Sequence, residues 1–201
     1  MPHVRSRVPT DQMRRLALDA ARAILIEEGP QAVTLMAVAK RISRTHANLL
    51  HHFGSAAELQ RELAAEMARS ICAEIADAVE ARRAGARSRR DVVDLVFDAF
   101  GRQGGGALAS WMLVNGNRDA LHPVLGTIHQ LLDRLHPEDG EVVRTTALGL
   151  VLMALGDALL GEPLSQSLDL PREAAREEAV RMVTEKMKSI DLAAGWNKEP
   201  D

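Results

Sequence analysis

Three consecutive residues near the N-terminus carry side chains suited to reading a nucleic acid. His46, Ala47 and Asn48 follow Thr45, a residue type that caps helix N-termini. An asparagine amide can bond adenine through both its oxygen and its nitrogen, and an alanine methyl group can contact the methyl group of thymine. At the start of a helix that enters the major groove, such side chains meet base edges. We therefore predict that these three residues contact bases.

Hydroxyl, cationic and imidazole side chains surround these residues, and such groups commonly contact phosphate. Residues 1–60 carry eight Lys or Arg against five Asp or Glu, net +3, whereas residues 61–201 carry seventeen against twenty-three, net −6. The positive end therefore coincides with the candidate base contacts and has the sign that DNA binding needs. The phosphate candidates are Thr34, Lys40, Arg44, Thr45, His51 and His52, and Arg41, which could equally form surface ion pairs.

Two short helices joined by a tight turn would position these side chains. Residues 34–53 contain no Gly or Pro, and Thr34 and Thr45 can each cap a helix. Ile42, Ser43 and Arg44 interrupt the helical periodicity between them. Two short helices with such a turn form the helix-turn-helix pattern. Apolar anchors recur at helical spacing at Leu35, Val38, Ala39, Leu49 and Phe53.

The rest of the chain also has helical periodicity, and it lacks the alternating pattern of strands. Tyr is absent and aromatic residues make up 2%, so an aliphatic core within helices is expected. We predict an all-α fold of about nine helices: three short ones, a long connector and a larger bundle. The expected helices span about 10–28, two within 34–53, 55–83, 91–100, 107–114, 119–135, 138–161 and 172–190. The expected breaks are the basic loop 82–90, a flexible joint at 104–106 and Gly161-Glu162-Pro163.

Several other classes of protein lack support in the sequence. Cys72 is the single cysteine, which excludes an intramolecular disulfide and fits a reducing cytosol. The longest apolar run, 147–160, is shorter than the roughly 20 residues that span a bilayer, so a buried helix is expected. We find no nucleophile elbow, P-loop or paired metal-ligand motif, and therefore predict no enzymatic activity, no cofactor and no membrane partner.

Three histidines recur at seven-residue intervals, at His122, His129 and His136. The first two would lie on one helical face about 10 Å apart. That separation is too large for one metal ion, because zinc–nitrogen bonds are about 2 Å long. We therefore predict surface or pocket histidines and no metal site.

The order of these features resembles the TetR family of bacterial transcriptional regulators over about fifty residues. The resemblance implies a DNA-binding domain at 10–55 after a disordered arm, 1–9. It also implies a ligand-binding and dimerisation domain at 56–201, with helix 56–83 connecting the two. The matching positions are Glu28-Gly29, Thr34, Val38-Ala39, Thr45, Leu49-Leu50-His51-His52-Phe53 and Glu58-Leu59.

The turn and two single residues depart from the family pattern. The turn has Ile42-Ser43-Arg44 where the family usually has Ala-Gly-Val, so Ser43 lacks glycine's freedom at positive φ. Leu50 stands where a Tyr often meets phosphate, and Ala56 stands where a Lys is common. Each missing contact is expected to weaken DNA affinity and flatten its dependence on salt.

The resemblance implies a cytoplasmic, homodimeric repressor that binds a palindromic operator and is released by an unidentified small-molecule effector. Helices at about 138–161 and 171–190 would form the dimer interface. The alternative is a helical sensor or scaffold of the same fold that has lost specific DNA binding. Asp157, a carboxylate in an apolar helix, is expected to meet a ligand, an Arg across the dimer or water. The candidate effector-binding residues are Phe97, Phe100, Trp111, Met112, His122, His129, Met153 and Asp157.

Overall fold

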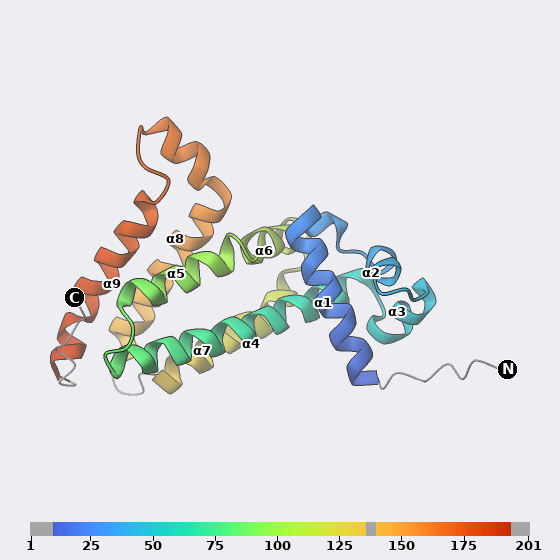
Figure 1. Ribbon diagram of the computed structural model, residues 1–201, viewed down its shortest axis with the longest axis horizontal. Helices are drawn as coiled ribbons and strands as arrows, with labels where there is room; N and C mark the ends of the chain where they lie inside the picture. The colour runs from blue at the N-terminus through green and yellow to red at the C-terminus, as the bar shows by residue number, and fades with distance from the viewer. Residues whose placement is uncertain (1–9, 136–139, 194–201) are drawn as a thin grey trace.

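The computed structural model describes residues 10–135 and 140–193, which form nine α-helices, two short 3-10 helices and no strand (Figure 1). The predicted all-α fold is thus confirmed, whereas the predicted arm 1–9 and His136 lie outside the described residues. In order, the helices are α1 (Thr10–Glu28), η1 (Pro30–Ala32), α2 (Leu35–Arg41), α3 (His46–Phe53), α4 (Ala56–Arg83), α5 (Arg89–Phe100), α6 (Gly105–Val114), η2 (Arg118–Leu121), α7 (His122–Leu135), α8 (Gly140–Ser167) and α9 (Ala174–Ala193).

The helices α1–α3 pack as a three-helix unit around the first turns of α4. Leu49 and Phe53 of α3 share one apolar core with Leu59 and Leu63 of α4 and with residues of α1 and α2. The Ser55 hydroxyl accepts a bond from the Glu58 amide at 3.1 Å and begins α4 as expected. The 28 residues of α4 then carry the chain about 40 Å away from this unit (Figure 1).

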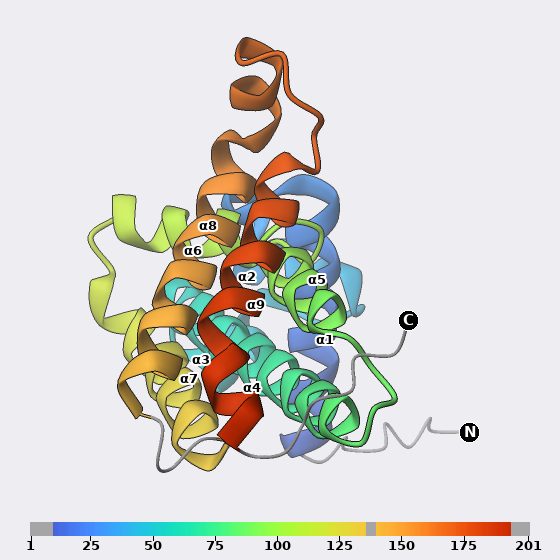
Figure 2. The same cartoon turned by 90° about the vertical axis from the view of Figure 1, so that its left-hand side faces the viewer.

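The remaining helices form a bundle around the far part of α4. Helix α7 lies along α4, and α5 lies between α4 and the pair α8–α9 (Figures 1 and 2). Arg176 of α9 donates to Asp94 and Asp98 of α5 at 3.0 Å each, and its guanidinium lies over the Phe97 ring, 5.2 Å from the ring centre. These polar contacts join α9 to α5 beside an apolar core that both helices share.

Helix α8 is longer than its sequence predicts. Gly161-Glu162-Pro163 does not end it, and Pro163 lies inside the helix. A proline removes a single backbone donor, and the next turn keeps its bonds, as the Leu168 amide shows by donating to Leu164 at 3.1 Å. The end where α8 joins α9 projects beyond the other helices in both views (Figures 1 and 2).

Gly161 instead makes room for an ion pair between α8 and the segment before α9. Arg172 bonds the carboxylate of Asp157, with 3.0 Å between Nη2 and Oδ2. A Cβ at Gly161 would lie 2.8 Å from Nη1 of Arg172. The partner of Asp157 is therefore an Arg of the same chain and not, as expected, a ligand, an Arg across the dimer or water, and these bonds raise the pKa of Arg172.

The predicted breaks at 82–90 and 104–106 are shorter in the structure, because polar caps and close packing extend the neighbouring helices. Ser88 forms a capping box with Asp91, so α5 begins at Arg89, which is buried. The predicted joint at 104–106 reduces to Gly104, since α6 begins at Gly105. The single helix expected over 119–135 is divided into η2 and α7.

The apolar surface of α8 is largely uncovered in the described part of the chain, so the expected buried helix is wrong. Leu148, Leu152 and Leu159, on one face, are 60%, 58% and 46% exposed. The apolar run 147–160 was predicted to be too short to span a bilayer. The observed helix has 28 residues, and by length and composition alone it could span a membrane. A single such helix is weak evidence for a membrane segment, and α8 packs against α5, α6 and α9.

Candidate DNA-binding surface and ligand cavity

Side-chain caps and a strained turn set the geometry between α2 and α3. The hydroxyl of Thr34 accepts a bond from the Ala37 amide at 3.1 Å, and that of Thr45 accepts from the Asn48 amide at 3.2 Å. Both predicted caps are confirmed. Ser43 has φ 53°, in the left-handed region that glycine adopts freely. Ile42 packs against the core, which leaves Arg44 exposed.

The predicted base contacts lie together at the start of α3. His46 and Ala47 are exposed. Asn48 is half-buried, and its Oδ1 is buried with no hydrogen-bond partner among the described residues. A bidentate bond to adenine needs both the oxygen and the nitrogen of the amide. Asn48 must therefore rotate its side chain before it can make that contact.

The predicted phosphate contacts border the same surface. Thr34, Lys40, Arg44, Thr45 and His51 are exposed, and His52 is half-buried. Burial lowers the pKa of His52, and the positive charges of His51 and Arg14 lower it further. His52 is therefore neutral near pH 7, where it can offer a hydrogen bond and adds no charge.

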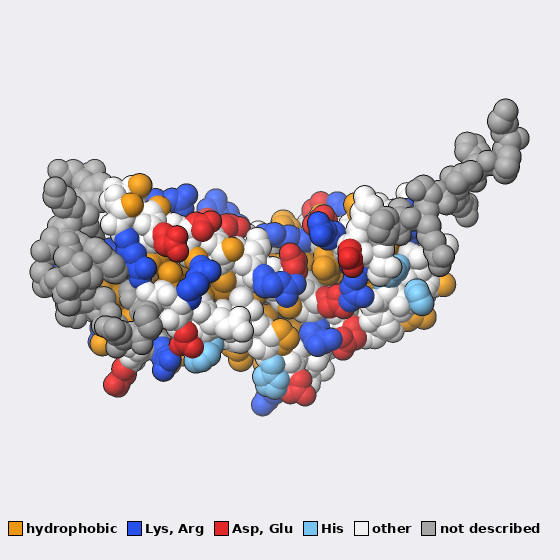
Figure 3. Space-filling model, turned by 90° about the horizontal axis from the view of Figure 1, so that it is seen from below, with side chains coloured by type: hydrophobic (Ala, Val, Ile, Leu, Met, Phe, Trp, Pro, Cys, Tyr) orange, Lys and Arg blue, Asp and Glu red, His pale blue; other side chains and the backbone are white. Residues whose placement is uncertain are grey.

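The two single-residue departures from the family pattern, Leu50 and Ala56, lie on or beside α3. Leu50 is 45% exposed and Ala56 begins α4, so neither supplies a polar contact. Arg41 pairs with Glu27 of α1 at 2.6 Å. Figure 3 shows basic, acidic and histidine side chains interspersed over one face of the molecule, with histidines both at the end that carries α2 and α3 and elsewhere on the face. The surface at this end thus combines the cations Lys40, Arg41 and Arg44 with the imidazoles His46, His51 and His52.

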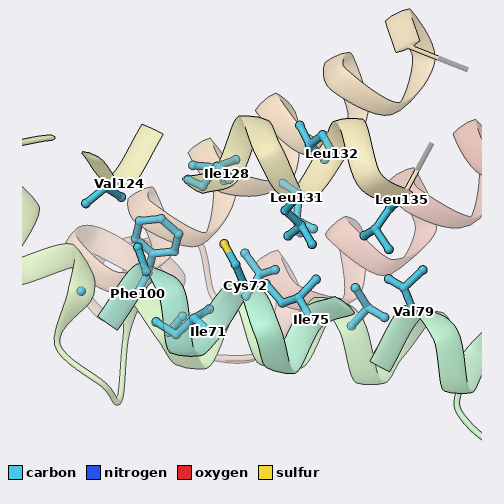
Figure 4. A pocket seen from close by; sticks show the side chains of 18 of the residues that line it. Ile71, Cys72, Ile75, Val79, Phe100, Val124, Ile128, Leu131, Leu132 and Leu135 are labelled. Atoms are coloured by element: carbon cyan, nitrogen blue, oxygen red, sulfur yellow. The ribbon is translucent and has the colours of Figure 1, made fainter. Parts of the chain in front are cut away.

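A cavity of about 240 Å³ lies in the bundle between α4, α5, α7 and α8. Figure 4 shows Phe100 and Val124 towards one end of it and Val79 and Leu135 towards the other. Between them lies Cys72, whose thiol pKa is raised by burial, so the group stays neutral. Cys72 is a small buried apolar residue, as expected. The wall of the cavity is therefore nearly all hydrocarbon.

Only Phe100 among the eight predicted effector-binding residues lines this cavity. Phe97 and Met112 are buried in two separate cores, and Met153 packs against one of them. Trp111 is half-buried in α6 and is not part of the lining. His122 and His129 are exposed beside Asp119 and Asp133, at 3.9 and 3.2 Å. Asp157 is held by Arg172.

The sequence interpretation missed most of the cavity wall, which comes largely from α4, α5, α7 and α8. The signal on α4 is the apolar residue at every fourth position, which predicted the helix but not the cavity beside it. Which face of α4 borders the cavity depends on how α4 packs against α7. The residue pattern of neither helix specifies that packing. The missed residues include Met67, Ile71, Cys72, Ile75, Val79, Arg82, Arg89, Ile128, Leu131 and Leu135.

The cavity and the helix-turn-helix share residues of α4. Ala64 and Met67 line the cavity. They also belong to the apolar core that contains Leu49 and Phe53 of α3. A ligand that displaced either side chain would therefore press on the packing that holds α3.

Two solved structures of the multidrug binding protein EbrR have a similar fold. The complex with imidazole has a TM-score of 0.59 and 20% identity, and the match covers 84% of this chain and 93% of that one. The complex with ethidium has a TM-score of 0.58 and 20% identity, with 86% and 99% covered. No match was found among curated proteins.

The family model described as bacterial regulatory proteins, tetR family, matches residues 17–63. The matched segment contains most of α1, all of α2 and α3, and the first turns of α4. These are the helices that carry the caps, the turn and the exposed start of α3. The proteins of this family are regulators and not enzymes, in agreement with the class predicted from the sequence. Over residues 17–63, the chain thus matches the tetR family of bacterial regulatory proteins, the family that the sequence resembles.

Proposed function

We propose that the protein is a cytoplasmic repressor that binds a palindromic operator as a homodimer and leaves it when a small molecule occupies the cavity. The exposed start of α3 supports the operator contacts, with His46, Ala47 and Asn48 on bases and the neighbouring hydroxyl, cationic and imidazole groups on phosphates. We place the DNA-binding domain at 10–55 and the ligand-binding and dimerisation domain at 56–201.

The uncovered leucine face of α8 supports the homodimer. Contiguous exposed apolar surface on a protein marks an interface. Pairing α8 and α9 with their copies would cover this face and would hold two α3 helices at a fixed separation. Operator half-sites lie about 34–36 Å apart, one turn of DNA, or at a multiple of it.

The observation that carries ligand response is the sharing of Ala64 and Met67 between the cavity and the core beneath α3. A ligand lowers operator affinity only by binding the released state more tightly than the DNA-bound state. Ala64 and Met67 belong both to the cavity and to the core beneath α3, so a ligand that contacts them can bind the two states with different affinity. The EbrR structures with imidazole and ethidium support a small-molecule role for the cavity.

Mobility-shift assays on DNA flanking the gene test the operator contacts. Replacing both His46 and Asn48 by Ala should abolish the specific shift, because both lie at the start of α3. His129→Ala, an exposed histidine on α7, is the matched control and should leave the shift unchanged. Equal shifts by the wild type and the double variant would overturn this assignment and would favour a sensor or scaffold that has lost specific DNA binding.

A further inference from the structure

The described wall of the cavity offers a ligand very few polar groups. Its side chains are aliphatic apart from Phe100, Cys72, Thr146 and two arginines, and none of them is an Asp or Glu. The Thr146 hydroxyl is already engaged, because it donates to the Val142 carbonyl at 2.7 Å. Burial raises the pKa of the Cys72 thiol and keeps it neutral. A ligand therefore meets hydrocarbon over most of the described wall.

The two arginines of the wall, Arg82 and Arg89, already interact with other groups of the protein. Burying a charged ligand is costly unless the protein supplies a partner for the charge. A cationic ligand would find no carboxylate among the described lining residues. An anionic ligand would compete with the groups with which the arginines already interact. An uncharged ligand needs neither a carboxylate nor such an exchange.

The cavity is long for its volume. Its lining on α4 extends from Ala64 to Arg82, 18 residues or about 27 Å along the helix. Its volume is only about 240 Å³, whereas the pockets that hold drug-sized ligands have roughly 300–1,000 Å³. A narrow apolar space of this length is filled better by a chain than by a fused ring system.

From these features we infer that the cavity binds a small, uncharged, chain-like aliphatic molecule, such as a medium-chain alcohol, that lies along α4. The affinity of such a ligand comes from the methylene groups that binding removes from water, and each of them contributes a factor of about four. The inference rests on the proposed function only in taking the cavity as the effector site.

Calorimetric titration with three ligands of equal chain length tests the absence of charge. At neutral pH, 1-octanol, octanoate and octyltrimethylammonium have a neutral, a negative and a positive head group. We expect 1-octanol to bind at least about tenfold more tightly than either ion, because each ion would lose its hydration without gaining a new partner. Binding of either ion that equals or exceeds that of 1-octanol would overturn the inference, as would no binding of 1-octanol.

A series of alcohols tests the chain-like shape. From 1-butanol to 1-decanol, affinity should rise about fourfold with each methylene group until the cavity is filled. 1-Decanol should bind more tightly than decahydro-2-naphthol, which has the same number of carbons in two fused rings. Affinity that does not depend on chain length, or tighter binding by the fused rings, would contradict a narrow apolar site.

Variants place the chain inside the cavity. Ile128 lines the cavity from α7 (Figure 4), so Ile128→Trp should fill part of it and weaken 1-octanol at least about tenfold. Leu125→Trp on the same helix is the matched control, because Leu125 is 58% exposed and is not part of the lining. Equal affinities of the two variants would place the alcohol outside the cavity and overturn the inference. Should Ile128→Trp not fold, Ala68→Val, a smaller addition to the wall from α4, supplies the same comparison.

The titrations contain no DNA, so they separate the ligand class from the proposed function. A protein that binds 1-octanol as expected and no operator would overturn the proposed repressor while leaving the ligand class intact. A protein that binds its operator but none of the alcohols would overturn the ligand class alone.

Discussion

The guanidinium of Arg14 in α1 donates a 2.8 Å hydrogen bond to the backbone carbonyl of His52 in the last turn of α3. The same guanidinium pairs with Glu62 of α4 and lies 5.1 Å from the centre of the Phe53 ring. A carbonyl in the last turn of a helix accepts no hydrogen bond from an amide of that helix. Arg14 therefore fastens the C-terminal end of α3 to both α1 and α4.

Replacing Arg14 tests this clamp. Arg14→Ala should lower the free energy of unfolding by about 1 kcal/mol, because a charged donor is lost from a site that is partly exposed. Chemical denaturation followed by circular dichroism measures the change. Arg15→Ala, an exposed neighbour on α1, is the control and should change stability little. Equal stability of the two variants would contradict the clamp.

The backbone at Ser43 predicts a stabilising substitution. A non-glycine residue in the left-handed region costs about 1–2 kcal/mol, and glycine costs about 0.5–1 kcal/mol through the unfolded chain. Ser43→Gly should therefore raise the free energy of unfolding by about 0.5 kcal/mol. Ser70→Gly, the same change in the interior of α4, should lower it by about 0.5 kcal/mol. A loss of stability in Ser43→Gly would contradict the strain assigned to the turn.

The lowered pKa of His52 predicts that the protein loses stability at acid pH. Since the folded state favours the neutral ring, His52 contributes stability that is present above its ordinary pKa of 6.5. That contribution is lost as the pH falls through the lower pKa of the folded state. An NMR titration of the ring should give a midpoint below 6.5, and Arg14→Ala should raise it. A wild-type midpoint at or above 6.5 would refute this environment for His52.

The leucine face of α8 predicts the site of dimerisation. Leu152→Glu should convert a dimer to a monomer, because a charge would be buried in the interface without a partner. Leu125→Glu on α7 is a control of equal exposure, since both leucines are 58% exposed. Sedimentation analysis at several concentrations measures the association. A Leu152→Glu protein that remains dimeric would place the interface elsewhere.

The parts of the fold that the sequence predicted correctly depend on interactions a few residues long. Thr34, Thr45 and Ser55 cap helices by bonds that span three residues, so the residue types alone indicate them. The need for positive φ at Ser43 followed from the glycine that the family usually has there. Periodicity located α4 to within a residue at each end.

The parts that the sequence did not predict depend on contacts between distant segments. Arg172 reaches Asp157 only because α8 passes Pro163 and the chain then turns back. Arg89 is buried because Ser88 and Asp91 start α5 early, against the cavity. The choice of Trp111, His122 and His129 as effector contacts relied on residue type, whereas the packing of α4 on α7 determines which side chains meet the cavity.

Fluorescence anisotropy of labelled DNA tests the central claim, sequence-specific DNA binding, most directly. The titration compares a duplex from the region flanking the gene with a scrambled duplex of equal length, at two salt concentrations. A repressor should bind the flanking duplex at least about 10³-fold more tightly at physiological salt. Both affinities should fall as salt rises, with a shallow slope because Leu50 and Ala56 supply no phosphate contact. Equal affinities for the two duplexes would contradict the account.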